Sequence, residues 1–149
     1  MPAAAAALVY LVPLTVIAVI DVRTMRAPNR YVYPLIALAV VLSLTLFHDD
    51  VAEALLGGVL AFAVLLVIAF FGRGRMGFGD VKYGLVCGIT VGLHGTLPML
   101  AFAILAGAAV AAVAVGFKLR TRQDVVAFTP FLLLGVVFSL LWSRPYLVL

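Results

Sequence analysis

Charged side chains are scarce in this chain. They make up 11% of its 149 residues, whereas 66% of the residues are hydrophobic. In soluble domains roughly a quarter of the residues are charged and about half are apolar. The scarcity of charge excludes an ordinary soluble domain, and a mean hydropathy of +1.29 indicates an integral membrane protein.

Metal ligands and catalytic nucleophiles are also rare. The single cysteine, Cys87, lies within an apolar run, which excludes a disulfide framework and a cysteine-based zinc site. The two histidines, His48 and His94, both fall on the predicted outer side of the membrane and form no HExxH pattern. We therefore expect no metal, no cofactor and no acyl-enzyme intermediate.

Apolar runs separated by short charged or glycine-rich breaks account for most of the chain. A helix that spans a bilayer needs about 20 apolar residues, so the length allows about six spans. The sequence predicts an all-α integral membrane protein: one membrane-embedded domain over residues 1–149, a bundle of about six transmembrane helices. The runs are 3–20, 31–47, 54–72, 81–94, 96–116 and 126–142, with a tight turn near His94-Gly95 between the fourth and fifth.

The basic residues indicate how these spans are oriented. If the chain crosses the membrane at every run, all but one of the basic residues fall on one side, which the positive-inside rule makes cytoplasmic. Both termini then lie outside. Topology thus accounts for the net charge of +4, and we expect no nucleic acid partner. The cytoplasmic set is Arg23, Arg26, Arg30, Arg73, Arg75, Lys82, Lys118, Arg120 and Arg122; Arg144, Asp49, Asp50 and Glu53 fall on the other side.

Two acidic residues fall on this cytoplasmic face at the rim of apolar runs. Asp21 closes the first run, and Asp80 opens the fourth. An ionisable group at such a boundary is a functional hypothesis by default. Two carboxylates held close together do not both ionise easily, so one keeps a proton while the other acts as a base. If the first and fourth helices are neighbours, the pair can activate water to cleave a peptide bond.

Glycines surround the second acid. Gly77 and Gly79 precede Asp80 and predict a flexible, uncrowded turn that a substrate backbone can approach. Further along, Gly84, Gly88 and Gly92 recur at every fourth residue. A stripe of small residues lets helix backbones approach closely, so we expect the fourth helix to pack tightly against a neighbour.

Less specific interpretations account for the same residues. Asp80 could simply cap a helix, and Asp21 could pair with Arg23 or Arg26. The two acids could also serve a small proton- or cation-coupled transporter, although such a pathway needs groups near the membrane midplane as well. A third alternative is a structural bundle without activity. Lys82 fits an interfacial anchor better than a catalytic group, and Asp124 fits a local ion pair or helix cap.

Three segments resemble the type IV prepilin peptidase family of GxGD membrane aspartic proteases, in particular its short members found with Flp/tight-adherence pilus systems. Asp21-Val22-Arg23 through Ala27-Pro28-Asn29 is similar to the first catalytic element, although Ala27 stands where a larger aliphatic residue is usual. Gly77-Phe78-Gly79-Asp80-Val81-Lys82 matches the family's GxGDxK. Phe128-Thr129-Pro130-Phe131 resembles the Pro-Phe segment that opens the last helix.

The resemblance implies an activity and a partner. Asp21 and Asp80 would be the catalytic pair, and Gly77, Gly79 and Lys82 would form the loop that presents the second acid. Family substrates are prepilin-like precursors with a short basic leader and an apolar helix, cut after a leader glycine at the cytoplasmic face of a prokaryotic inner membrane. Long members also carry a cysteine-containing segment linked to methylation. We expect peptidase activity without methyl transfer from this chain.

Overall fold

The computed structural model describes residues 2–24, 29–46, 51–72, 76–117 and 127–143, and over these ranges the chain is all-helical. The predicted all-α fold is therefore confirmed. The helices are α1 (Pro2–Thr24), α2 (Asn29–Leu46), α3 (Val51–Phe71), α4 (Phe78–Gly116) and α5 (Thr129–Ser143).

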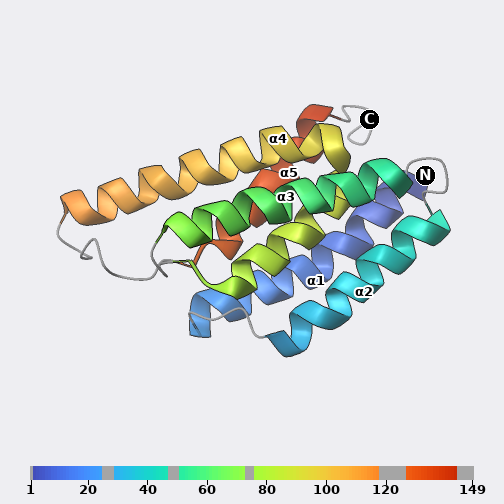
Figure 1. Cartoon of the computed structure of the whole chain (residues 1–149), viewed down its shortest axis with the longest axis horizontal. Helices are drawn as coiled ribbons and strands as arrows, with labels where there is room; N and C mark the ends of the chain where they lie inside the picture. Colours follow the sequence, from blue (N-terminus) through green and yellow to red (C-terminus); the bar gives the residue numbers. More distant parts are fainter. Residues whose placement is uncertain (1, 25–28, 47–50, 73–75, 118–126, 144–149) are drawn as a thin grey trace.

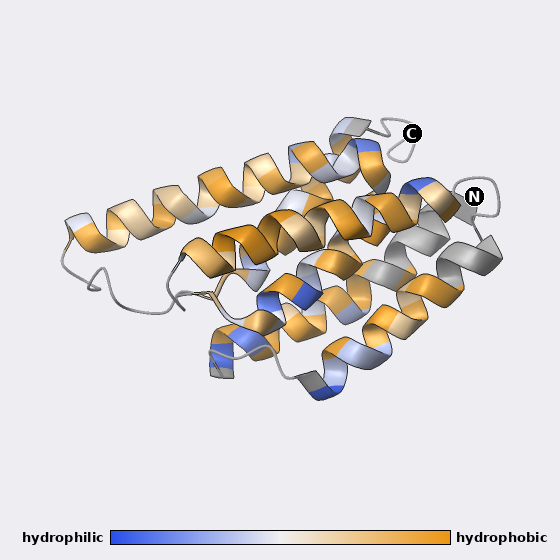
Figure 2. Cartoon of the chain, in the orientation of Figure 1, coloured by the Kyte–Doolittle hydropathy of each residue, from blue (hydrophilic) through white to orange (hydrophobic). Residues whose placement is uncertain are grey.

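The helices lie side by side in an elongated bundle (Figure 1), in which α4 packs against both α3 and α5. Hydrophobic residues cover the middle of the bundle, and hydrophilic ones gather toward its ends (Figure 2). Many large apolar side chains are exposed, among them Val59, Val67 and Leu105 at 61%, 54% and 70%. Two described helices, Val51–Phe71 and Phe78–Gly116, are long and apolar enough to cross a membrane. These features fit a helical membrane protein.

Helix α4 consists of two segments that meet at Gly92, where the chain turns back along the bundle (Figure 1). Gly92 has φ of 74° and ψ of 176°, a backbone conformation that is essentially restricted to glycine. The predicted turn near His94-Gly95 therefore lies two to three residues too late. Gly92 was expected inside a helical stripe, and its positive φ makes it the reversal point instead.

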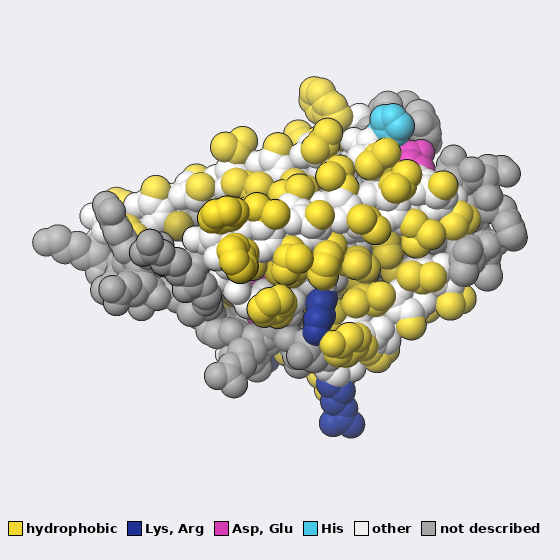
Figure 3. Space-filling model, in the orientation of Figure 1, with side chains coloured by type: hydrophobic (Ala, Val, Ile, Leu, Met, Phe, Trp, Pro, Cys, Tyr) yellow, Lys and Arg dark blue, Asp and Glu magenta, His cyan; other side chains and the backbone are white. Residues whose placement is uncertain are grey.

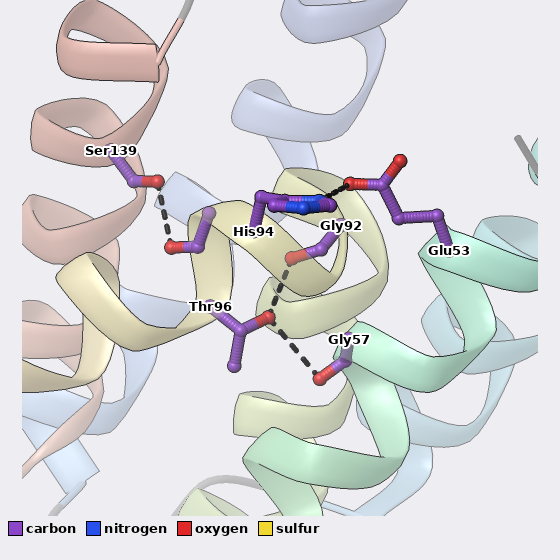
Figure 4. Close-up of polar contacts among 7 residues, drawn as sticks. Glu53, Gly57, Gly92, His94, Thr96 and Ser139 are labelled. Carbon is purple, nitrogen blue, oxygen red and sulfur yellow. Dashed lines mark hydrogen bonds and ion pairs between the residues drawn. The ribbon is translucent and has the colours of Figure 1, made fainter.

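Side chains from three helices hold this reversal in place (Figure 4). His94 Nδ1 and Glu53 Oε1 are 2.7 Å apart, which ties α4 to the first turn of α3. The Thr96 hydroxyl donates to the Gly92 carbonyl oxygen at 2.7 Å and lies 3.3 Å from that of Gly57. Ser139 on α5 donates to the Gly95 carbonyl oxygen at 2.7 Å. The reversal is thus anchored to both neighbours of α4.

The first segment of α4 packs against α3 with almost no side-chain volume between them. A Cβ atom added at Gly57 would lie 2.6 Å from the Gly88 carbonyl oxygen, and one added at Gly88 would overlap the backbone of Gly57. At Gly84 an added Cβ would overlap the side chain of Leu65. The predicted close approach of the fourth helix is therefore confirmed, and its neighbour is α3.

Two helix-interior prolines line a groove between α1 and α2. Pro13 in α1 and Pro34 in α2 both line an open apolar groove with a cavity volume of about 570 Å³. The groove runs between the two helices as far as Ile20, the residue next to Asp21. The helices α1 and α2 therefore leave open space between them along this face.

The described charged side chains separate toward the two ends. Arg23 lies in the last turn of α1, Arg30 in the first turn of α2 and Lys82 in the first turns of α4, all at one end. Glu53 lies in the first turn of α3, at the other end. Figure 3 shows basic side chains well apart from the acidic and histidine ones. The remaining members of the predicted charge pattern, together with Ala27, Pro28 and Asp124, lie outside the described residues: Arg26, Asp49, Asp50, Arg73, Arg75, Lys118, Arg120, Arg122 and Arg144.

Candidate active site

Asp21 lies inside the last turn of α1 and does not end it. The helix continues to Thr24, with Val22 and Arg23 exposed on its outer face and Asp21 facing inward. Only 2% of Asp21 is exposed. A carboxylate buried to this degree must be hydrogen-bonded or protonated, since its desolvation would otherwise be costly.

Asp80 lies in the first turn of α4. Gly77 is the N-cap in an extended conformation, and the Asp80 N–H donates to the Gly77 carbonyl oxygen at 3.1 Å. Gly79 is also within this turn, so the predicted flexible loop before Asp80 is wrong: the helix begins at Phe78. Asp80 is buried, and a Cβ added at Gly77 would lie 4.0 Å from Asp80 Oδ2. Gly77 therefore leaves this side of the carboxyl group uncrowded.

The two acids meet at Thr129, the first residue of α5. Thr129 Oγ1 lies 2.9 Å from Asp80 Oδ1 and is also hydrogen-bonded to Asp21 Oδ2. Thr129 is completely buried. Sequence reasoning expected the acids to meet, and it treated the segment around Thr129 only as the start of the last helix. The structure therefore adds a third polar residue, from a third helix, to the predicted pair.

Thr129 lies in the first turn of α5, which is closed by backbone hydrogen bonds. The Phe128 carbonyl oxygen accepts hydrogen bonds from the N–H groups of Phe131 at 3.1 Å and Leu132 at 3.2 Å, which closes the first helical turn. Pro130 has no N–H to leave unsatisfied and is well tolerated at this position. The hydroxyl between the two acids thus comes from a formed helix rather than from a loop.

Two contacts missed by sequence reasoning fix the start of α4. The buried Tyr83 hydroxyl donates to the Leu14 carbonyl oxygen on α1 at 2.8 Å. Lys82 Nζ donates to the Tyr33 hydroxyl on α2 at 2.6 Å and lies 4.4 Å from the centre of its ring. Lys82 was predicted to belong to the loop that presents Asp80; it lies instead inside α4, where its contacts with Tyr33 tie this helix to α2.

The arrangement is suited to proton transfer. Asp21 and Asp80 come from different helices and are bridged by one hydroxyl oxygen, so a proton held by one acid is only two hydrogen bonds from the other. In the part of the chain that the structure describes, no three His, Cys, Asp or Glu side chains gather as a metal site would require. Two carboxyl groups that share a proton can act as acid and base together.

The known proteins that this chain resembles are leader peptidases. The model of the type IV leader peptidase family matches residues 8–112, a range that contains both acids. The prepilin leader peptidase/N-methyltransferase of Bacillus subtilis is 30% identical over 92% of this chain and 55% of its own length. The protein of the same name from Xanthomonas campestris pv. campestris is 28% identical over 84% of this chain and 45% of its own length.

These matches cover only part of the relatives' length. The chain spans about half the length of the curated relatives, and no solved structure matches it. The family model nevertheless covers more than half of the chain. The chain thus belongs to the type IV leader peptidase family.

Proposed function

We propose that the chain is an aspartic endopeptidase that removes the short basic leader of prepilin-like precursors. The observation that carries the proposal is the convergence of Asp21 and Asp80 on one buried hydroxyl oxygen. The relatives named as prepilin leader peptidases support the substrate class. Peptide hydrolysis is the activity proposed for this chain, with Asp21 and Asp80 as its catalytic residues.

The proposed reaction needs one water molecule and one proton shared by the two acids. The ionised carboxylate takes a proton from water as the water oxygen bonds to the scissile carbonyl carbon, and the protonated carboxyl group gives its proton to the carbonyl oxygen. As the resulting diol collapses, the C–N bond breaks, the proton taken from water passes to the leaving nitrogen, and one diol hydroxyl returns its proton to the other carboxylate. The products are a carboxylic acid and an amine, and one proton is again shared by the pair.

We place this site at the cytoplasmic face of a prokaryotic cell membrane. Arg23, Arg30 and Lys82 lie at the same end of the bundle as the two acids, as the positive-inside rule requires for a cytoplasmic end. A precursor whose basic leader remains in the cytosol would bring its cleavage site to this end. About six spans, with both termini outside, complete the proposed topology.

Labelling of single cysteines from one side of the membrane tests this topology. In a Cys87→Ser background, Arg23→Cys should react with a membrane-impermeant maleimide only in inverted vesicles. Glu53→Cys should react only in intact spheroplasts, because it lies at the opposite end of the bundle. Labelling of both positions from the same side would refute the orientation.

Cleavage of a defined precursor tests the activity. Purified protein in detergent should cut a peptide with a basic leader, a glycine and an apolar helix of about 20 residues, at the glycine, as read by mass spectrometry. The same peptide with the leader glycine replaced by tryptophan is the matched control and should remain intact. Equal cleavage of both peptides would contradict leader processing, and cleavage of neither would contradict the peptidase assignment.

The distribution of charge disfavours transport. In the described residues, Asp, Glu, Lys, Arg and His occur only toward the ends of the bundle: Asp21, Arg23, Arg30, Asp80 and Lys82 at one end, and Glu53 and His94 at the other. A proton or cation pathway would need such groups near the membrane midplane. Should the protein cut no precursor, a flux assay comparing wild type with Asp21→Asn would decide for or against transport.

A further inference from the structure

Thr129 makes contacts that constrain the protons of the acid pair. Its hydroxyl oxygen is within hydrogen-bond distance of both Asp21 Oδ2 and Asp80 Oδ1. The residue is 0% exposed, so water does not compete for the hydroxyl. It lies beyond residue 112, where the family match ends. The role of this hydroxyl must therefore be derived from its own geometry.

A hydroxyl group has one proton to donate and lone pairs to accept with. Thr129 can donate to only one of the two acids. Its contact with the other acid is attractive only if that acid is protonated and donates to Thr129 Oγ1. With both acids ionised, one contact would set an oxygen lone pair against a carboxylate. With both protonated, the stronger charge-assisted bond to an ionised carboxylate would be lost.

From this we propose that Thr129 is a positioning residue that keeps the Asp21–Asp80 pair in the state with one shared proton. That state is the only one with an acid and a base at once, which the hydrolysis requires. The hydroxyl does not need to touch the substrate. It holds the two carboxyl groups at a fixed separation and stabilises the reactive protonation state over a wider range of pH.

The surroundings leave this role to Thr129. Among the described residues of α3 and α5 the one titratable side chain is Glu53, which lies at the far end of α3 from the site. On α4, the Tyr83 hydroxyl donates to the Leu14 carbonyl oxygen, and Lys82 Nζ donates to Tyr33 on α2. On α1, Arg23 is exposed. Thr129 is therefore the side chain that links the two acids directly.

The kinetic test compares Thr129→Val, which has the same shape without the hydroxyl, with Thr129→Ser, which retains it. Thr129→Val should lower kcat about 10- to 100-fold, the effect of losing one hydrogen bond to a charged group, and leave KM within about threefold. The bell-shaped plot of kcat against pH should become narrower by about one pH unit in this variant. Its acidic limb should shift to higher pH and its alkaline limb to lower pH. Thr129→Ser should restore both kcat and the width of the profile.

A buried threonine elsewhere provides the matched control. Thr96 is also 0% exposed, and its hydroxyl donates to the Gly92 carbonyl oxygen at the opposite end of the bundle. Thr96→Val should alter thermal stability without changing the width of the pH profile. If Thr129→Val does not fold, Thr129→Ala removes the same hydroxyl without a branched side chain. An unchanged profile in the folded Thr129 variant would overturn the proposed role.

The kinetic test rests on the proposed peptidase function, so a second measurement is independent of cleavage. Infrared spectroscopy of the purified protein detects the C=O band of a protonated carboxyl group, which Asp80→Asn or Asp21→Asn should remove or shift. In the wild type this band should persist with one protonated acid over a wider pH range than in Thr129→Val. Equal ranges would refute the role of Thr129 even if the protein cuts no precursor, and a difference would support it.

Discussion

Replacement of Asp80 by asparagine is expected to lower kcat/KM for leader cleavage by about 10²- to 10⁴-fold, the usual contribution of a general acid or base. Asparagine has almost the same shape as aspartate and can still bond to Thr129, so the contact that joins α4 to α5 should survive. The group can no longer hold or release a proton at the reacting atoms. Initial rates of precursor cleavage, measured by mass spectrometry with a known amount of folded protein, give the effect.

Asp21→Asn should lose activity to a similar extent, and the double variant should be no worse than either single one. Groups that act as a unit are strongly non-additive, because removing one already stops the shared step. Two acids with independent roles would instead multiply their effects. A double variant much slower than both single variants would therefore contradict the shared-proton mechanism.

Glu53→Gln is the matched control for these changes. It also exchanges a carboxylate for an amide, at the other end of the bundle, and the amide can still bond to His94. Cleavage should remain within about threefold of the wild type. If Glu53→Gln lost as much cleavage activity as Asp80→Asn, a carboxylate-to-amide change would harm the protein in general. The result would then contradict the assignment of Asp80 as a catalytic residue.

The acid pair could be predicted from the sequence because each acid interrupts an apolar run. Asp21 and Asp80 are conspicuous at the ends of such runs, and the basic residues around them indicate one common face. That the two side chains meet at one buried point depends also on how α1, α4 and α5 pack together. The same reasoning could not find Thr129, because a threonine at the start of a helix is equally well a cap or a packing residue. Its partners, 108 and 49 residues away, depend on how α5 docks.

Glycine is the residue whose role the sequence left most ambiguous. Gly79 before Asp80 suggested a flexible turn, yet it lies in the first turn of α4, where an N-cap glycine at Gly77 begins the helix. Gly92 suggested the inside of a packed helix, yet it adopts the positive φ of a chain reversal. Gly84 and Gly88 fulfil the prediction. The role of each glycine depends on which part of the folded chain packs against its backbone. Tertiary structure determines this, so the local sequence does not show it.

Enlarging Gly88 is expected to have the largest effect on stability. Its added Cβ would overlap the Gly57 backbone and lie 2.8 Å from the Ala61 Cβ, so α3 and α4 would have to separate. Overpacking of this kind costs about 1–3 kcal/mol for alanine and more for leucine. Thermal unfolding in detergent can be measured as the loss of soluble, monodisperse protein with temperature. The midpoint should be clearly lower for Gly88→Ala than for the wild type, and Gly88→Leu should yield little folded protein.

Gly116→Ala is the matched control, because the same change is made in the same helix where nothing lies within 4 Å of the added Cβ. Alanine is the better helix former, so this variant should be as stable as the wild type or gain up to about 1 kcal/mol. Since the segment of α4 that carries Gly88 also carries Asp80, folded Gly88→Ala should lose cleavage activity beyond its loss of folded protein. If Gly88→Ala and Gly116→Ala unfold at the same midpoint, the close α3–α4 contact is wrong, and with it the support that fixes Asp80 beside Thr129.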